Sequence, residues 1–147
     1  MVTDSSTPGF RSHLRATTSA SAIPYGYTIT IWSSGTVSAD VIGHPHLAEI
    51  LLFMAGAVLG FVVVSLGAYG TLGPVTREPV SAALPAWAFA HWISAGASIV
   101  AVWAADHAIA STAGWTVAGF LATSAYLVLN AAQATLAVRE RPVRTRR

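Results

Sequence analysis

The sequence predicts an all-α integral membrane protein, a compact bundle of four transmembrane helices whose N and C termini are both cytoplasmic. Three observations support this prediction: a low charge content, long apolar runs and a one-sided distribution of arginine. Of the 147 residues, 54% are apolar and 10% are charged, whereas an average soluble domain is about 25% charged. So few charges cannot cover a water-soluble domain of this size, which disfavours an ordinary soluble enzyme.

Residues 1–22 are rich in Ser and Thr and contain no long apolar run, so they are not expected to be a secretory signal peptide. We expect them to form a flexible cytoplasmic tail. A short amphipathic stretch around Phe10 and Leu14, lying on the membrane surface, is the alternative for part of this segment.

The segment 23–42 is the least obvious span because it carries six Ser and Thr side chains. Its length suits a membrane crossing, and Pro24 suits a first helical turn. Gly43 and Pro45 suit a helix stop. An amphipathic β-hairpin and a re-entrant loop are the competing interpretations.

Three apolar runs are better defined, and each is long enough to cross roughly 30 Å of hydrocarbon at about 1.5 Å per residue. Proline and glycine separate the first run from the second, and an Asp-His pair follows the second. The predicted transmembrane domain covers 23–138, and 139–147 forms a basic cytoplasmic tail. Its four helices are expected at about 23–42, 47–70, 86–105 and 114–138.

The arginines favour four spans over three. The chain has eight basic residues, all of them arginine. Four spans place Arg11, Arg15, Arg77 and the five arginines of 139–147 on one side, whereas three spans divide them between the two sides. Positive charge gathers on the cytoplasmic side of membrane proteins. The sequence therefore predicts a multi-pass protein of the cell membrane, with the lipid bilayer as its first partner.

The last predicted helix carries a polar stripe. Steps of three and four residues keep these side chains on one helical face. Polar groups in hydrocarbon need partners, so the stripe either bonds neighbouring helices or lines a hydrated path. The stripe consists of Thr112, Thr116, Gly119, Thr123, Tyr126, Asn130 and Gln133.

The hydroxyl-rich segment 23–42 is too polar to face lipid, so it is expected to sit inside the bundle or an oligomer. His91 is the only ionisable residue well inside its span, and it is a candidate proton relay, ligand or hydrogen-bond anchor. Neutral hydrogen bonding to a neighbour is the alternative for His91. The residues predicted to line a pore or bind a ligand are Tyr27, Thr30, Ser33, Ser34, Ser65, His91, Thr123, Tyr126, Asn130 and Gln133.

Acids and histidines gather where the first three predicted helices reach the outer side, and no arginine accompanies them. They are expected to form an outer mouth that concentrates cations, or to be solvated loop residues. Their spacing matches no established metal motif, so no metal and no cofactor is assigned, although a metal or haem site is an alternative. These residues are Asp40, His44, His46, Glu49, Asp106 and His107.

Small residues indicate close helix packing. Gly56 and Gly60 form a GxxxG pattern, Gly67 follows seven residues later, and Ser94 and Ser98 extend a row of small residues on the next span. Such faces let helix backbones approach closely. We assign the three glycines to helix packing within the subunit or between subunits.

No enzyme motif is present: the sequence has no P-loop, GxSxG, HExxH or GxGxxG pattern. Cysteine is absent, which excludes disulfides and thiolate chemistry. The basicity indicates membrane topology, and no nucleic-acid partner is expected. We predict a non-enzymatic, homo-oligomeric channel or facilitator for a small polar solute or ion, including protons through His91. The alternatives are a non-catalytic accessory subunit of a larger membrane complex and a metal- or haem-binding membrane protein.

Overall fold

The computed structural model describes the backbone of residues 10–69 and 87–139, and the side chains of 24–68, 91–133 and Thr135. These residues form four α-helices: α1 Phe10–Ile42, α2 Leu47–Tyr69, α3 Trp87–Ile109 and α4 Thr112–Arg139. The prediction of an all-helical bundle is therefore confirmed for the described part of the chain. The expected tail at 139–147 lies outside it, apart from the backbone of Arg139.

Three helices are long and apolar enough to cross a membrane: Leu47–Ala68 in α2, His91–Ile109 in α3 and Thr112–Gln133 in α4. The described part of α1 is not apolar enough to be counted with them, because its Ser and Thr side chains lower its mean hydropathy. By length and composition, these three helices are consistent with a helical membrane protein.

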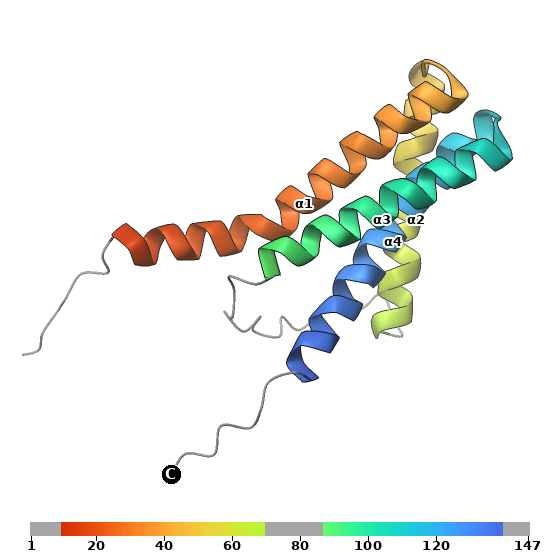
Figure 1. Cartoon of the computed structure of the whole chain (residues 1–147). Coiled ribbons are helices and arrows are strands. Elements are labelled where there is room, and N and C mark those ends of the chain that lie inside the picture. The colour runs from red at the N-terminus through yellow and green to blue at the C-terminus, as the bar shows by residue number, and fades with distance from the viewer. Residues whose placement is uncertain (1–9, 70–86, 140–147) are drawn as a thin grey trace, which may run out of the picture.

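Helix α1 begins at Phe10, whereas the sequence predicted a flexible tail to residue 22 and a helix from residue 23. Nothing in 10–22 breaks a helix, since this stretch has neither Gly nor Pro. Pro24 consequently lies inside α1 and not in its first turn. A proline there removes a single backbone hydrogen bond, and α1 changes direction part-way along its length (Figure 1).

The connection from α1 to α2 has the expected stop. Gly43 has a φ of 116°, the left-handed conformation in which a glycine closes a helix, and its N–H donates to Ala39 O at 3.2 Å. At the start of α2, the N–H of His46 donates to Glu49 Oε2 at 3.0 Å. That bond is half of a capping box, so Glu49 helps to begin α2.

Helix α3 continues to Ile109, four residues beyond the predicted end at 105. The sequence suggested a solvated connection starting at Asp106, but this side chain is buried and the helix runs past it. Ala110, with a φ of 26°, ends the helix, and α4 starts two residues later at Thr112.

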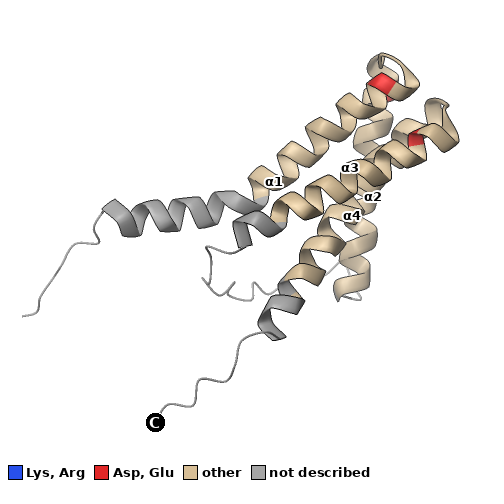
Figure 2. Cartoon of the chain, in the orientation of Figure 1, with Lys and Arg blue, Asp and Glu red and all other residues tan. Residues whose placement is uncertain are grey.

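Helix α4 lies at the centre of the bundle. It packs against α1, α2 and α3, while α1 and α3 also pack against each other and α2 rests mainly on α4. α1 and α3 run in the same direction and α4 runs back in the opposite direction (Figure 1). Figure 2 shows acidic positions where α1 and α3 finish, which we call the acidic end of the bundle. The described acids are Asp40 near the end of α1, Asp106 near the end of α3 and Glu49 in the first turn of α2.

Glycine brings α2 and α4 into backbone contact. A Cβ atom on Gly56 would collide with the carbonyl oxygen of Thr116, and one on Gly60 would lie 2.7 Å from Phe120 O. In return, a Cβ on Gly119 of α4 would collide with Phe53 O. These three glycines set the distance between the helices. A Cβ atom on Gly67 would meet nothing within 4 Å in the described structure, so Gly67 lies outside this contact.

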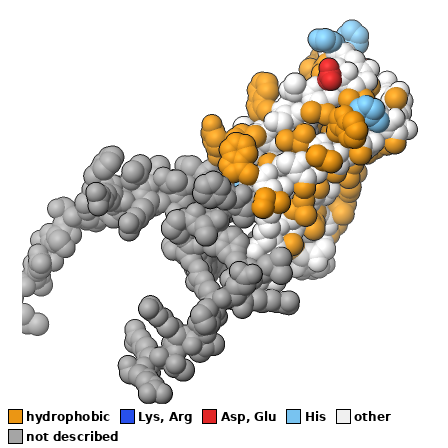
Figure 3. Space-filling model, viewed as in Figure 1, with side chains coloured by type: hydrophobic (Ala, Val, Ile, Leu, Met, Phe, Trp, Pro, Cys, Tyr) orange, Lys and Arg blue, Asp and Glu red, His pale blue; other side chains and the backbone are white. Residues whose placement is uncertain are grey.

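The outer surface of the bundle is largely apolar. Large hydrophobic side chains of α2 and α3 are exposed, among them Leu47 at 71% and Ile93 at 68%. Hydrophobic side chains cover much of the face seen in Figure 3, and histidines gather at the acidic end. An apolar exterior around buried polar groups is what a lipid solvent requires.

Candidate functional site: a polar seam between α1 and α3

Two rows of small polar side chains are buried where α1 and α3 pack together. Thr30, Ser34 and Ser38 follow one another at steps of four along α1. Steps of four also separate Ser94 and Ser98 on α3, and Asp106 lies two such steps further on. All six side chains are fully buried. We call this set the polar seam.

The polar seam is closed at the acidic end by a hydrogen bond between the two helices. Ser38 Oγ donates to Asp106 Oδ2 at 2.7 Å. The second oxygen, Oδ1, is buried and has no hydrogen-bond partner in the described part of the chain. Gly114 of α4 lies beside this oxygen: a Cβ atom there would be in ordinary contact with it at 3.8 Å, and only 2.8 Å from Ile42 Cδ1. A carboxyl group with one unpaired oxygen is unusual in a bundle interior.

The middle of the polar seam is only partly paired. Ser98 Oγ donates to Ser94 O at 2.7 Å, which satisfies it within its own helix. Thr30 Oγ1 does the same with Gly26 O at 2.9 Å. Ser34 Oγ is fully buried and finds no partner among the described residues. Its hydroxyl therefore remains available in the centre of the bundle.

At the opposite end, α4 joins the polar seam. Ser94 Oγ donates to Gln133 Oε1 at 2.7 Å, and the hydroxyls of Tyr27 and Thr123 are 3.1 Å apart. The rings of Tyr27 and Tyr126 pack with centroids 5.8 Å apart. The polar side chains of α4 thus hold α1 and α3 in register.

His91 borders this inner group. Its Nδ1 is buried and has no hydrogen-bond partner in the described structure. A Cβ atom on Gly26 would lie 2.6 Å from the Tyr126 hydroxyl and 3.6 Å from His91 Cβ. Gly26 therefore allows the Tyr126 hydroxyl to approach α1 close to His91. Tyr126 itself hydrogen-bonds to Asn130.

Three buried polar atoms that have no hydrogen-bond partner among the described residues therefore lie in or beside the polar seam: Asp106 Oδ1, Ser34 Oγ and His91 Nδ1. Asp106 and His91 lie near the two ends of the polar seam, and Ser34 lies in its middle. His91 and Asp106 are 15 residues apart on α3, about 22 Å at 1.5 Å per residue. This is most of the roughly 30 Å thickness of a bilayer core.

The structure brings together most of the residues predicted to line a pore. Tyr27, Thr123, Tyr126 and Gln133 take part in side-chain contacts that join α4 to α1 or α3. Thr30 and Ser34 are buried on α1, and His91 lies beside Gly26 of the same helix. Ser33 and Asn130 are half-buried beside them.

The polar stripe of α4 bonds neighbouring helices at Thr123 and Gln133, and its Gly119 lies at the contact with α2. Ser65 is separate, because α2 packs mainly on α4.

The predicted outer mouth is not one cluster. Asp106 is buried with Ser38, while Glu49 caps α2. His107 Nδ1 hydrogen-bonds to Trp103 O at 2.9 Å, and its ring packs against that of Trp103 at a tilt of 50°. Asp40, His44 and His46 are exposed. Within 24–68 and 91–133, no three His, Asp or Glu side chains are close enough to hold a metal ion.

Sequence reasoning missed the part that α3 plays in the polar seam. Ser94 and Ser98 were interpreted as small packing residues, and Asp106 was placed at the mouth. Asp106 continues their four-residue spacing, with Val102 between, and a matching spacing joins Thr30, Ser34 and Ser38 on α1. These two matching rows would have indicated a shared polar interface.

No protein family, curated protein or solved structure matches this chain.

Proposed function

We propose that α1 is the fourth membrane span, which places both chain ends on one side of the bilayer. The proposal is supported by the way α1 accompanies α3, an evident span, in the same direction (Figure 1). Ser38 of α1 pairs with Asp106 near one end of that span, and Gly26 of α1 lies beside His91 at its other end, where a Cβ atom on Gly26 would be 3.6 Å from His91 Cβ. Because α1 contacts its neighbours at both of these depths, we expect it to cross the same thickness of the bilayer as they do.

The outward face of α1 is compatible with lipid despite its hydroxyl groups. Thr28 Oγ1 donates to Pro24 O at 2.8 Å, and Thr36 Oγ1 donates to Trp32 O at 3.0 Å. Each exposed hydroxyl is thus satisfied by its own helix, which lowers the cost of facing hydrocarbon. Trp32, 75% exposed between them, adds apolar surface.

We propose that the protein is a small membrane channel that conducts protons along the polar seam. The observation that carries this function is the set of three buried atoms, in Asp106, Ser34 and His91, that have no hydrogen-bond partner in the described part of the chain. Unpaired polar groups in a membrane interior are costly and tend to mark ion or proton pathways. Carboxyl, hydroxyl and imidazole groups can each accept a proton and release it again, so a proton crosses without net chemical change.

Close packing of the polar seam favours protons over a larger solute. Its six side chains are fully buried, and Ser38 and Ser94 are held by hydrogen bonds of 2.7 Å. A solute larger than water would have to separate α1 from α3. Protons need only a chain of hydrogen-bonding groups and a few buried waters, which occur in protein interiors where polar partners are available.

Ser34→Ala is expected to lower proton flux into liposomes by about tenfold, because it removes the hydroxyl in the middle of the polar seam at a cost of about 1 kcal/mol or more. Flux is measured with an internal pH-sensitive dye after an acid jump. Ser33→Ala is the matched control: it deletes the same group one residue away, where the side chain is only half-buried. Equal flux in Ser34→Ala and the parent protein, or equal losses in both variants, would contradict the proposal.

A second candidate is a membrane subunit that packs beside copies of itself or beside a larger complex. It is favoured by α2, which rests mainly on α4 and leaves side chains such as Met54, Val58 and Phe61 exposed. A Cβ atom on Gly67 or on Gly96 would meet nothing within 4 Å in the described structure, so both positions leave room for another helix to approach. Purification in mild detergent distinguishes these arrangements: a stable second protein supports the accessory role, whereas a pure homo-oligomer supports self-assembly.

A further inference from the structure

A cavity of about 270 Å³ lies at the acidic end, between the first turns of α2 and α4. It is separate from the polar seam, since none of the six seam residues lines it. Its walls combine one carboxylate, Glu49, with the hydroxyl-bearing Ser111 and Thr112 and the apolar Ile42 and Ala110. Gly43 and His44 also line it. The indole of Trp115, 3% exposed, forms the inner wall.

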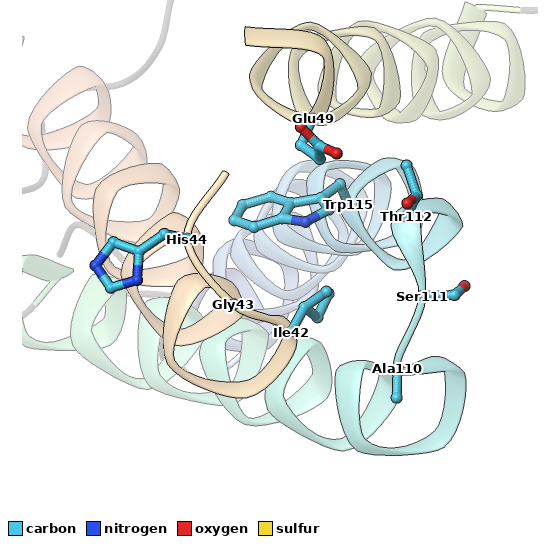
Figure 4. A pocket seen from close by; sticks show the side chains of 8 residues that line it. All are labelled: Ile42, Gly43, His44, Glu49, Ala110, Ser111, Thr112 and Trp115. Carbon is cyan, nitrogen blue, oxygen red and sulfur yellow. The ribbon is translucent and has the colours of Figure 1, made fainter. Parts of the chain in front are cut away.

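Glu49 supplies the charge of this cavity. The structure gives its carboxylate one hydrogen bond, in which the His46 N–H donates to Oε2, so the second oxygen is free to bind a ligand. Figure 4 shows this carboxylate beside the Trp115 ring, with Thr112 nearby, while the imidazole of His44 points away from them. Residues 24–68 and 91–133 contain no Lys or Arg that could neutralise Glu49.

Glu49 is the one acidic residue among the lining residues, and no Lys or Arg lines the cavity, so its side chains favour a cation over an anion. The volume is several times the roughly 30 Å³ that one water occupies, so it exceeds the needs of a bare metal ion. Hydroxyl groups suit the N–H groups of an ammonium, and the side chains of Ile42 and Ala110 suit its carbon atoms. We propose that this cavity binds a small organic ammonium group, with Glu49 as its counter-ion.

The ammonium could belong to a free amine or to an ethanolamine lipid headgroup, because both present the same group. Ethylammonium is the probe for the shared chemistry. With three non-hydrogen atoms at up to about 1.5 kcal/mol each, its dissociation constant is expected to be about 1 mM at best. Binding is measured by ligand-detected NMR on the full chain in phosphatidylglycerol nanodiscs, which lack amine headgroups.

Glu49→Gln is expected to weaken ethylammonium binding by about tenfold, because the charge-assisted bond is lost while the volume is kept. The glutamine oxygen can still accept the His46 N–H, so the start of α2 is preserved. Asp40→Asn is the matched control, since Asp40 is an exposed acid at the same end that does not line the cavity; it should bind as the parent protein does.

Adding phosphatidylethanolamine to the nanodiscs separates the two sources. Weaker ethylammonium binding there identifies the lipid headgroup as an occupant, and unchanged binding identifies a free amine. Either result supports an ammonium site. No saturable binding up to about 50 mM, some fifty times the expected constant, or equal binding by Glu49→Gln and the parent protein, would overturn the inference. Neither result depends on proton conduction through the polar seam.

Discussion

Replacing Gly56 with alanine is expected to destabilise the bundle by about 2–3 kcal/mol, the upper part of the range for overpacked interiors. The added Cβ would collide with the carbonyl oxygen of Thr116 and would lie 3.0 Å from the Phe120 nitrogen. Both obstacles are backbone atoms, which cannot move away by changing a rotamer. The helices must therefore separate, and the reciprocal contact at Gly119 loosens with them.

Gly67→Ala is the control for this prediction. It adds the same methyl group to the same helix, but nothing lies within 4 Å of the new atom. Stability is measured as the free energy of unfolding in a detergent titration. Gly67→Ala is expected to be neutral or slightly stabilising, because alanine favours a helix by up to about 1 kcal/mol over glycine. Equal stability of Gly56→Ala and Gly67→Ala would show that α2 and α4 do not meet at Gly56.

Asp106→Asn is expected to abolish most of the proton flux, with a loss of tenfold or more, since a tenfold change needs only about 1.4 kcal/mol at the limiting step. An amide does not exchange protons as a carboxyl group does, although it has nearly the same shape. Its oxygen can still accept the Ser38 hydroxyl, now 2.7 Å from Oδ2, so the packing of α1 against α3 is retained. The flux should therefore fall while the unfolding free energy changes by less than about 1 kcal/mol.

Two further variants sharpen this experiment. Asp40→Asn removes an exposed carboxylate near the same end of α1 and should leave the flux unchanged. Asp106→Leu removes the acceptor altogether, so Ser38 loses its partner and the bundle should also lose stability. Proton flux in Asp106→Asn equal to that of the parent protein would remove this carboxyl group from the pathway.

The apolar helices were predictable because their evidence is local. The helix expected at 47–70 is found at Leu47–Tyr69, and the one expected at 114–138 is found at Thr112–Arg139. Gly43 closes α1 as expected. The length of an apolar run, its hydropathy and the helix-breaking residues beside it all depend on neighbouring positions in the chain. A single sequence is therefore enough to predict such helices.

The beginning of α1 and the burial of Asp106 were not predictable in this way. Arginine and hydroxyl residues near the start of a chain indicate a tail as readily as a helix, and Pro24 suits a helix start as well as an interior bend. An Asp-His pair after an apolar run usually marks a connection. Whether Asp106 is solvated depends on Ser38, 68 positions away, and a contact of that kind is fixed only by packing.

The proposed crossing of the membrane by α1, beside α3, can be tested directly by labelling. The chain contains no cysteine, so single cysteines introduced as Ser5→Cys, Ser111→Cys and Thr145→Cys can be labelled separately with a membrane-impermeant maleimide. The account predicts that Ser5→Cys and Thr145→Cys react from one side of the bilayer and Ser111→Cys from the other. Labelling of Ser5→Cys from the same side as Ser111→Cys would leave α1 outside the set of spans and contradict the account.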